Sequence, residues 1–178
     1  MESKDRKLIL SEDVNGSSVR GLIQKILEIN LYDQEKEEKE VGYKREPIEL
    51  IVNSFGGSVY DGFALVSVME TSKTPIHTIC LGSAMSMGFI IYLAGHKRFA
   101  HRFSTFMYHE IISGGFQKTE EHRRNVKECE RLQKQYDDYV LEKTTLYQEK
   151  LDNVKSTVTD WYIPAEEAVK YGIVQELV

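Results

Sequence analysis

The sequence predicts an α/β domain built on a largely parallel sheet. Short apolar runs at residues 48–52 and 76–81 indicate buried strands. Each run is followed by a glycine-containing turn and then by a segment that we expect to be helical. Alternation of strands and helices is typical of parallel sheets that helices cover. A chain of 178 residues fits one compact domain, so we expect residues 1–178 to form a single unit.

The first part of the chain predicts a strand, a helix and a long connection. Residues 7–10 are a short strand candidate, and Asn15 or Ser17 can cap a helix that runs to Ile29. Residues 31–46 are dense in charge and poor in apolar side chains. We expect them to form an exposed, mobile connection rather than a binding tail.

The middle of the chain predicts short strands that alternate with helices. The expected elements are a strand at 48–52, a helix at 59–71 with Ser58 and Asp61 as a variant capping box, a strand at 76–81, an apolar helix that opens within Gly82–Gly88 and reaches Ala94, and strands at 98–100 and 105–109.

The last third of the chain contains the longest expected element. Thr119 is expected to cap a helix that runs towards Gln148, about 45 Å at 1.5 Å per residue. A domain of this size has a diameter of only about 40 Å, so such a helix either projects or lies along a neighbour. Pro164 and Gly172 then bound a final helix, and residues 173–178 predict a closing strand.

Composition argues against several classes of function. The 28 acidic and 23 basic residues give a net charge of -5, which disfavours a surface for nucleic acid or anionic membranes. Two cysteines, Cys80 and Cys129, are too few for a disulfide framework and suit a reducing compartment. The charged N-terminus predicts no signal peptide, and the apolar stretch at 85–94 is too short to cross a bilayer. We therefore expect a soluble, cytoplasmic protein.

Gly82–Gly88 is the first candidate for chemistry. A serine at the point where a strand gives way to a helix lies close to free backbone N–H groups and to the positive end of the helix dipole. Both features favour a nucleophile whose substrate develops an oxyanion. Ser83 and Ser86 compete for this role, and a simple capping turn is the alternative explanation of the motif.

A serine nucleophile needs a base and an orienting acid. Among the histidines, His109 stands at the end of an expected strand, where sites gather in α/β sheets. The acid is less clear. Asp160 precedes bulky apolar residues that could partly bury it, yet it could also simply end a loop. The other histidines are His77, His96, His101 and His122, and the other acids after His109 in the sequence include Asp137, Asp138 and Asp152.

Five motifs, in order and in spacing, closely resemble the Clp protease proteolytic subunit family. The resemblance covers about three-quarters of the chain, from Ile48 to Val178. It implies a crotonase-like fold of repeated ββα units with a protruding "handle" helix at about 119–148. The motifs are Asn53-Ser-Phe-Gly-Gly-Ser-Val59, Gly82-Ser-Ala-Met-Ser-Met-Gly88, Met107-Tyr-His109, Gly114-Gly-Phe-Gln117 and Asp160-Trp-Tyr-Ile-Pro-Ala-Glu-Glu-Ala168.

The resemblance also implies an activity and its residues. Ser86 matches the family's nucleophile, His109 its general base and Asp160 its acid, while the backbone N–H groups of Gly57 and Met87 match its oxyanion hole. It implies a self-compartmentalising serine endopeptidase that cleaves unfolded proteins or peptides inside stacked heptameric rings. No metal or organic cofactor is expected. Because the sequence has no Gly-x-x-x-x-Gly-Lys-Ser/Thr loop, ATP would be hydrolysed by a separate AAA+ unfoldase.

Some positions depart from the family pattern. Phe55 stands where the family usually has Pro, Lys118 where it has Gly, and Thr159 where an Arg commonly bridges the rings. The family's N-terminal loops have little counterpart before Lys7. A divergent, phage-encoded member fits these departures, and we expect its ring-to-ring contact to be weak.

Three other functions remain open on the sequence. A related viral head-maturation protease would use the same triad without an ATPase. An inactive ring subunit would only scaffold an active paralogue, although such subunits usually lose a triad residue. An acyl-CoA hydratase of the same fold would share an oxyanion hole but would normally use carboxylates.

Overall fold

The computed structural model describes residues 6–157 and 159–178. Part of the charged N-terminus, on which the signal-peptide expectation rests, therefore lies outside the described residues. The strands are β1 (Lys7–Leu10), β2 (Ile48–Ser54), β3 (Ile76–Met85), β4 (Lys97–Ala100), β5 (Thr105–Tyr108), β6 (Trp161–Pro164) and β7 (Glu176–Leu177). The helices are α1 (Gly16–Lys39), α2 (Val59–Thr71), α3 (Met87–Leu93), α4 (Thr119–Lys143), α5 (Gln148–Ser156) and α6 (Ala165–Lys170).

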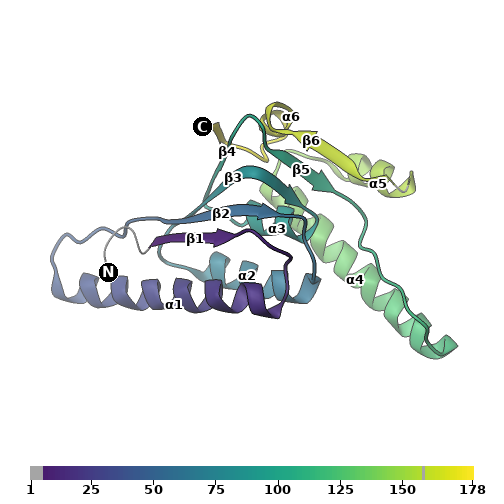
Figure 1. The fold of residues 1–178 in the computed structure, drawn as a ribbon, viewed down its shortest axis with the longest axis horizontal. Helices are drawn as coiled ribbons and strands as arrows, with labels where there is room; N and C mark the ends of the chain where they lie inside the picture. The colour runs from purple at the N-terminus through teal and green to yellow at the C-terminus, as the bar shows by residue number, and fades with distance from the viewer. Residues whose placement is uncertain (1–5, 158) are drawn as a thin grey trace.

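A seven-stranded sheet organises the molecule (Figure 1). Its main path runs β1-β2-β3-β4-β7 with all neighbours parallel, and only the β5–β6 pair is antiparallel. The predicted α/β class with a largely parallel sheet is confirmed. In the structure β3 continues to Met85, four residues beyond the expected end, because its second half finds a different partner. Its first half pairs with β4, and residues 83–85 pair with β5.

The core lies between this sheet and the helices that cover one of its faces (Figure 1). Helix α3 is buried along its whole length, from Met87 to Leu93, which explains why this stretch is apolar on every side. Ser58 caps α2 as expected, since its side chain accepts a hydrogen bond from the Asp61 N–H. Among the described residues, no helix is both long and apolar enough to span a membrane.

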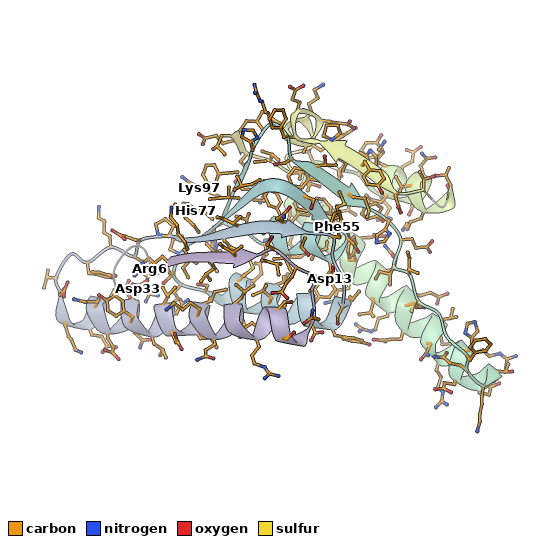
Figure 2. All side chains as sticks on the ribbon, in the orientation of Figure 1. Arg6, Asp13, Asp33, Phe55, His77 and Lys97 are labelled. Carbon is orange, nitrogen blue, oxygen red and sulfur yellow. The ribbon has the colours of Figure 1, made fainter. Side chains whose placement is uncertain are left out.

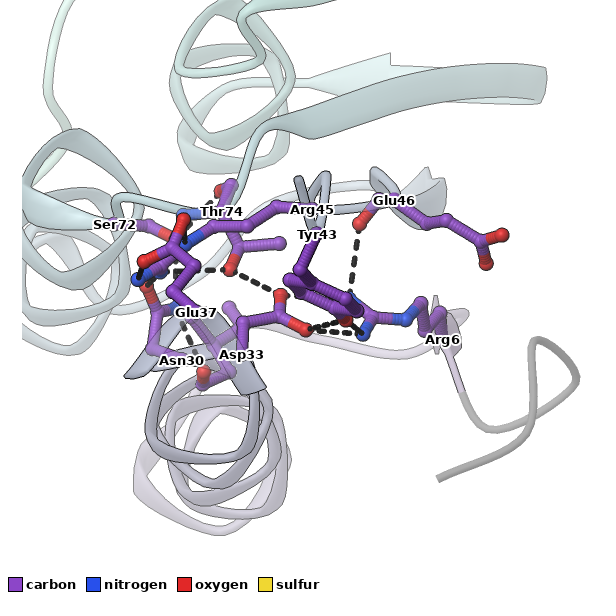
Figure 3. A network of polar contacts seen from close by, with 10 residues as sticks. Arg6, Asn30, Asp33, Glu37, Tyr43, Arg45, Glu46, Ser72 and Thr74 are labelled. Atoms are coloured by element: carbon purple, nitrogen blue, oxygen red, sulfur yellow. Dashed lines mark hydrogen bonds and ion pairs between the residues drawn. The ribbon is translucent and has the colours of Figure 1, made fainter. Parts of the chain in front are cut away.

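Most of residues 31–46 are exposed, as expected, but residues 31–39 extend a helix instead of forming an irregular connection. Asn15 caps α1, and the helix continues through Lys39 instead of ending at Ile29. The reason is a polar cluster that charge counting cannot reveal (Figure 3). The Asp33 side chain is fully buried and accepts hydrogen bonds from Arg6, Tyr43 and Thr74. Burial alone would raise the pKa of Asp33, but these donors outweigh it and lower the pKa to about 2.

The long helix α4, in contrast, is shorter than expected, and part of it packs against the subunit's own core. It ends at Lys143, so its 25 residues span about 37 Å, and residues 148–156 form the separate helix α5. Lys118, not Thr119, occupies the N-cap position. Its apolar stripe divides in two: Tyr136 and Val140 belong to the subunit's own core, while the N-terminal half projects from the body (Figure 1).

The C-terminal segment follows the expectation only in part. Pro164 is the N-cap of α6 rather than its first residue, and α6 ends just before Gly172, whose φ of 66° suits glycine. The closing strand is limited to Glu176–Leu177, which pairs with β4.

Candidate active site

The register of three strands gathers Ser86, His109 and Asp160 at one point. Ser86 directly follows β3, and its N–H donates to the Met107 carbonyl of β5 at 2.9 Å. His109 directly follows β5, and Asp160 directly precedes β6. Because β5 and β6 are antiparallel with Tyr108 opposite Trp161, His109 and Asp160 are the next residues at that end of the two strands. Residues far apart in the sequence thus become neighbours.

The carboxyl ends of the central parallel strands lie at this same edge of the sheet. Figure 2 shows Phe55, which follows β2, at this edge, whereas His77 and Lys97 lie where β3 and β4 begin. Loops at this edge supply the sites of open α/β sheets.

The side chains of Ser86 and His109 are in direct contact. His109 Nε2 lies 2.8 Å from Ser86 Oγ, and its other ring nitrogen, Nδ1, lies 3.4 Å from Asp160 Oδ1. With a proton on Nδ1 facing the carboxylate, Nε2 is free to accept the serine proton. The imidazole is largely buried, with 16% of its side chain exposed, so the contact is shielded from competing water.

Ser86 has an unusual backbone conformation. Its φ is 50°, and among the described residues it is the sole non-glycine residue with a positive φ. Such a conformation is costly for a side chain with a Cβ and persists only where the surroundings enforce it. Here the Ser86 N–H is bonded to Met107, and the Ser86 carbonyl accepts from the Tyr136 hydroxyl at 3.1 Å. The sharp turn places Oγ at the start of α3, as in the nucleophile elbow of α/β-hydrolases.

Two backbone N–H groups lie beside the serine. Met87 is the first residue of α3, so its N–H has no acceptor within the helix. The Gly56–Gly57 turn packs against it: a Cβ on Gly56 would lie 2.7 Å from Ser86 Cβ and 2.9 Å from Met87 N. Val14 bonds to the Gly56 carbonyl and to the Ser58 N–H, and so holds the Gly57 backbone in place from both sides. The Gly56–Gly57 turn and the Met87 N–H therefore lie next to Ser86.

Asp160 is more exposed than its apolar neighbours suggested. Its side chain is 49% exposed, and Tyr162 is exposed as well, so the expected strengthening by partial burial is absent. The rival acids are occupied elsewhere. Asp152 accepts from Gln148 and pairs with Lys155 on α5, and the other rivals, Asp137 and Asp138, have partners on or beside α4.

Ser83 and the other histidines lie apart from this contact. Ser83 sits within β3, where its N–H and hydroxyl both donate to the Asn53 side chain. His77 packs against Phe99, and the Nδ1 atom of His96 accepts the Ile76 N–H. These observations favour Ser86 and His109 as the reactive pair.

A cleft that the sequence did not reveal lies next to the turn that contains Gly57. It has a volume of about 370 Å³ and lies between the start of α2, residues 111–114 and α4. Gly57 is among its lining residues, and Ile111, Ile112 and Leu132 supply apolar walls. His122, assigned no role from the sequence, also lines this cleft. No sequence signal identifies the cleft, since its walls come from three separate segments.

Comparisons with known proteins agree with the geometry. The Clp protease family model matches residues 3–178. An "ATP-dependent Clp protease proteolytic subunit" from Deinococcus radiodurans is 32% identical over 177 residues, which cover 98% of this chain and 81% of that protein. An "ATP-dependent Clp protease proteolytic subunit 1" from Prochlorococcus marinus is 30% identical over 174 residues, with coverages of 96% and 82%.

A solved structure shares the fold. A point mutant of ClpP1 from Listeria monocytogenes has a TM-score of 0.82 at 22% sequence identity, over 98% of this chain and 92% of that one. The fold implied by the resemblance in sequence is therefore confirmed.

Proposed function

Because this chain belongs to the Clp protease family, which consists of serine-type endopeptidases, we propose that Ser86, His109 and Asp160 are its catalytic triad. The observation that carries the proposal is the 2.8 Å contact between His109 Nε2 and Ser86 Oγ, with Asp160 on the opposite side of the ring. The whole chain, residues 1–178, would act as one peptidase domain.

In the proposed mechanism, His109 Nε2 takes the proton of Ser86 Oγ as that oxygen attacks a peptide carbonyl. The carbonyl oxygen becomes an oxyanion and accepts hydrogen bonds from the N–H groups of Gly57 and Met87. Asp160 holds the imidazolium, which then gives its proton to the leaving amine. Water, activated by the same histidine, releases the acyl group from Ser86. None of these steps needs a metal or an organic cofactor.

Active-site labelling tests this proposal. A fluorophosphonate probe should modify Ser86, and Ser86→Ala should lose both labelling and peptide cleavage. Ser83→Ala is the matched control, since it removes a hydroxyl that lies 3.3 Å from Asn53 Oδ1 and is not bonded to His109. Labelling at Ser83, or full cleavage by Ser86→Ala, would refute the assignment.

The proposed working form is a homo-oligomer of heptameric rings, stacked in pairs, that cleaves unfolded proteins or peptides inside a chamber. Exposed apolar side chains support an assembly contact, because Ile112 and Phe116 are largely unburied beside the projecting half of α4. A subunit rarely leaves such side chains grouped in water without a partner.

Native mass spectrometry across a dilution series tests the assembly. Phe116→Ser should lower the proportion of the largest assemblies without changing the thermal unfolding of the subunit, because Phe116 makes no contribution to the core. Phe103→Ser, at an exposed phenylalanine just before β5 begins, serves as control. A monomer that keeps full peptidase activity would refute the chamber.

The relatives' names support an ATP-dependent setting, and a separate AAA+ unfoldase is the partner that we propose. A cytoplasmic location suits the two free thiols, of which Cys80 is buried with its pKa raised to about 11. Co-purification of an ATPase with Ser86→Ala protein would support the pairing. Degradation of folded substrates without ATP would contradict it and would favour the viral maturation protease.

A further inference from the structure

One turn of helix α4 contacts both sides of the proposed reactive pair. On the serine side, the Tyr136 hydroxyl donates to the Ser86 carbonyl at 3.1 Å. On the histidine side, Asp137 accepts the hydroxyl of Tyr108, the residue before His109, at 2.6 Å. The segment after the histidine is held as well, since the Ile111 N–H donates to Gln133 Oε1 at 2.7 Å.

Gln133 and Asp137 are also connected to each other and to α5 by hydrogen bonds and an ion pair. Gln133 Nε2 donates to Asp137 Oδ1 at 2.8 Å, one helical turn along α4. Lys155 of α5 pairs with the other carboxylate oxygen of Asp137 and compensates its buried charge. Burial, together with the bond to Asp137, raises the pKa of Tyr108, so its hydroxyl stays protonated and remains a donor.

We propose that Gln133 and Asp137 are positioning residues that set the distance between His109 and Ser86. The inference rests on the proposed triad. His109 stands at the end of a four-residue strand and enters the extended segment 110–118, so its own strand restrains it on one side only. Asp137 holds the Tyr108 side chain before it, and Gln133 holds the backbone of Ile111 after it. Tyr136, on the same turn, fixes the serine.

This arrangement predicts an effect on the chemical step rather than on substrate binding. Tyr108 and Asp137 do not line the 370 Å³ cleft, whereas Gln133 bonds the N–H of Ile111, which is one of its walls. A displaced imidazole, by contrast, weakens proton transfer, and a shift of about 1 Å in a reacting group can cost about 100-fold in rate. We therefore expect loss of the Tyr108 hydroxyl to lower kcat with an unchanged KM.

The test uses two substitutions that keep side-chain shape. Tyr108→Phe removes the hydroxyl that reaches Asp137, and Gln133→Met removes the acceptor of the Ile111 N–H. Tyr139→Phe is the matched control, because Tyr139 also lies on α4 and donates its hydroxyl to a carboxylate, that of Glu70, away from the triad. For each protein, one measures the rate of fluorophosphonate labelling, kcat and KM for a peptide, and thermal unfolding.

We expect Tyr108→Phe and Gln133→Met each to lower labelling rate and kcat by about tenfold or more, and Tyr108→Phe to keep KM within about twofold. Tyr139→Phe should keep wild-type rates even where its unfolding temperature falls. Wild-type rates in both test variants, or an equal loss of rate in Tyr139→Phe, would overturn the positioning role. Failure of the wild-type protein to label at Ser86 would instead refute the triad itself, so the two failures are distinguishable.

Discussion

Replacing Asp160 tests how much the exposed carboxylate contributes to catalysis. At 3.4 Å from His109 Nδ1, a full charge stabilises the imidazolium by about 2.4 kcal/mol if the effective dielectric constant is about 40, between the values of about 20 and about 80 for protein surface and water. This intermediate value suits the Asp160 side chain, which is half exposed. At about 1.4 kcal/mol per factor of ten, Asp160→Ala should lower kcat by about 60-fold.

Asp160→Asn should lose more than Asp160→Ala. An amide can donate to Nδ1 and so hold the imidazole with its proton on Nε2, which cannot accept the proton of Ser86. In a serine protease whose triad is closely bonded, this substitution costs about 10⁴ in kcat, and the longer, more exposed contact here should cost less.

The assay is steady-state cleavage of a fluorogenic peptide, with circular dichroism to verify folding. Asp152→Asn is the control, since Asp152 is an exposed carboxylate on α5 that pairs with Lys155. We expect it to stay within about twofold of wild type. A loss below about threefold in Asp160→Ala, or an equal loss in Asp152→Asn, would show that Asp160 does not act on His109.

Two further substitutions test the surroundings of the site and the N-terminal cluster. Gly56→Ala should lower kcat by about tenfold or more, because the added Cβ would lie 2.7 Å from Ser86 Cβ and because the Gly56 φ of 103° disfavours a side chain. Unchanged peptide cleavage would contradict this expectation. Asp33→Asn should lower the free energy of unfolding by about 2 kcal/mol at pH 7, because the folded-state pKa of Asp33 is depressed to about 2 from 3.8. That stability is present above about pH 4 and is lost as the pH falls towards about 2, so the denaturant midpoints of variant and wild type should converge there, and a constant gap would contradict the argument.

Local signals were enough to locate the turn that contains Ser83 and Ser86, whereas the choice of Ser86 came from the family resemblance. Gly82–Gly88 carries its own strand-to-helix turn, and the apolar stretch after it marks a buried helix, so Ser86 is placed by neighbours within a few residues. The α/β class was predictable for the same reason. Even so, the pattern ended β3 too early, because residues 83–85 pair with β5, a partner that the local pattern does not show.

Features that depend on distant partners were not predictable from one sequence. The pairing of His109 with Asp160 follows from the β5–β6 register, which joins segments about 50 residues apart, and only the family resemblance pointed to it. The end of α1 was misjudged since Arg6 and Thr74, which bury Asp33, come from far along the chain. The long helix was expected to project or to lie along a neighbour, although the C-terminal half of α4 packs within the subunit.

The late pairing of β6 with β5 has a consequence for synthesis of the protein in the cell. Asp160 leaves the ribosome after both Ser86 and His109, and at about 5–20 residues per second the roughly 74 residues from Ser86 to Asp160 take about 4–15 s to add. Under the proposed triad, a nascent or truncated chain that stops before residue 160 has a serine and a histidine without their carboxylate. The unfinished polypeptide is therefore a poor protease, and neighbouring nascent chains are spared until the subunit is complete.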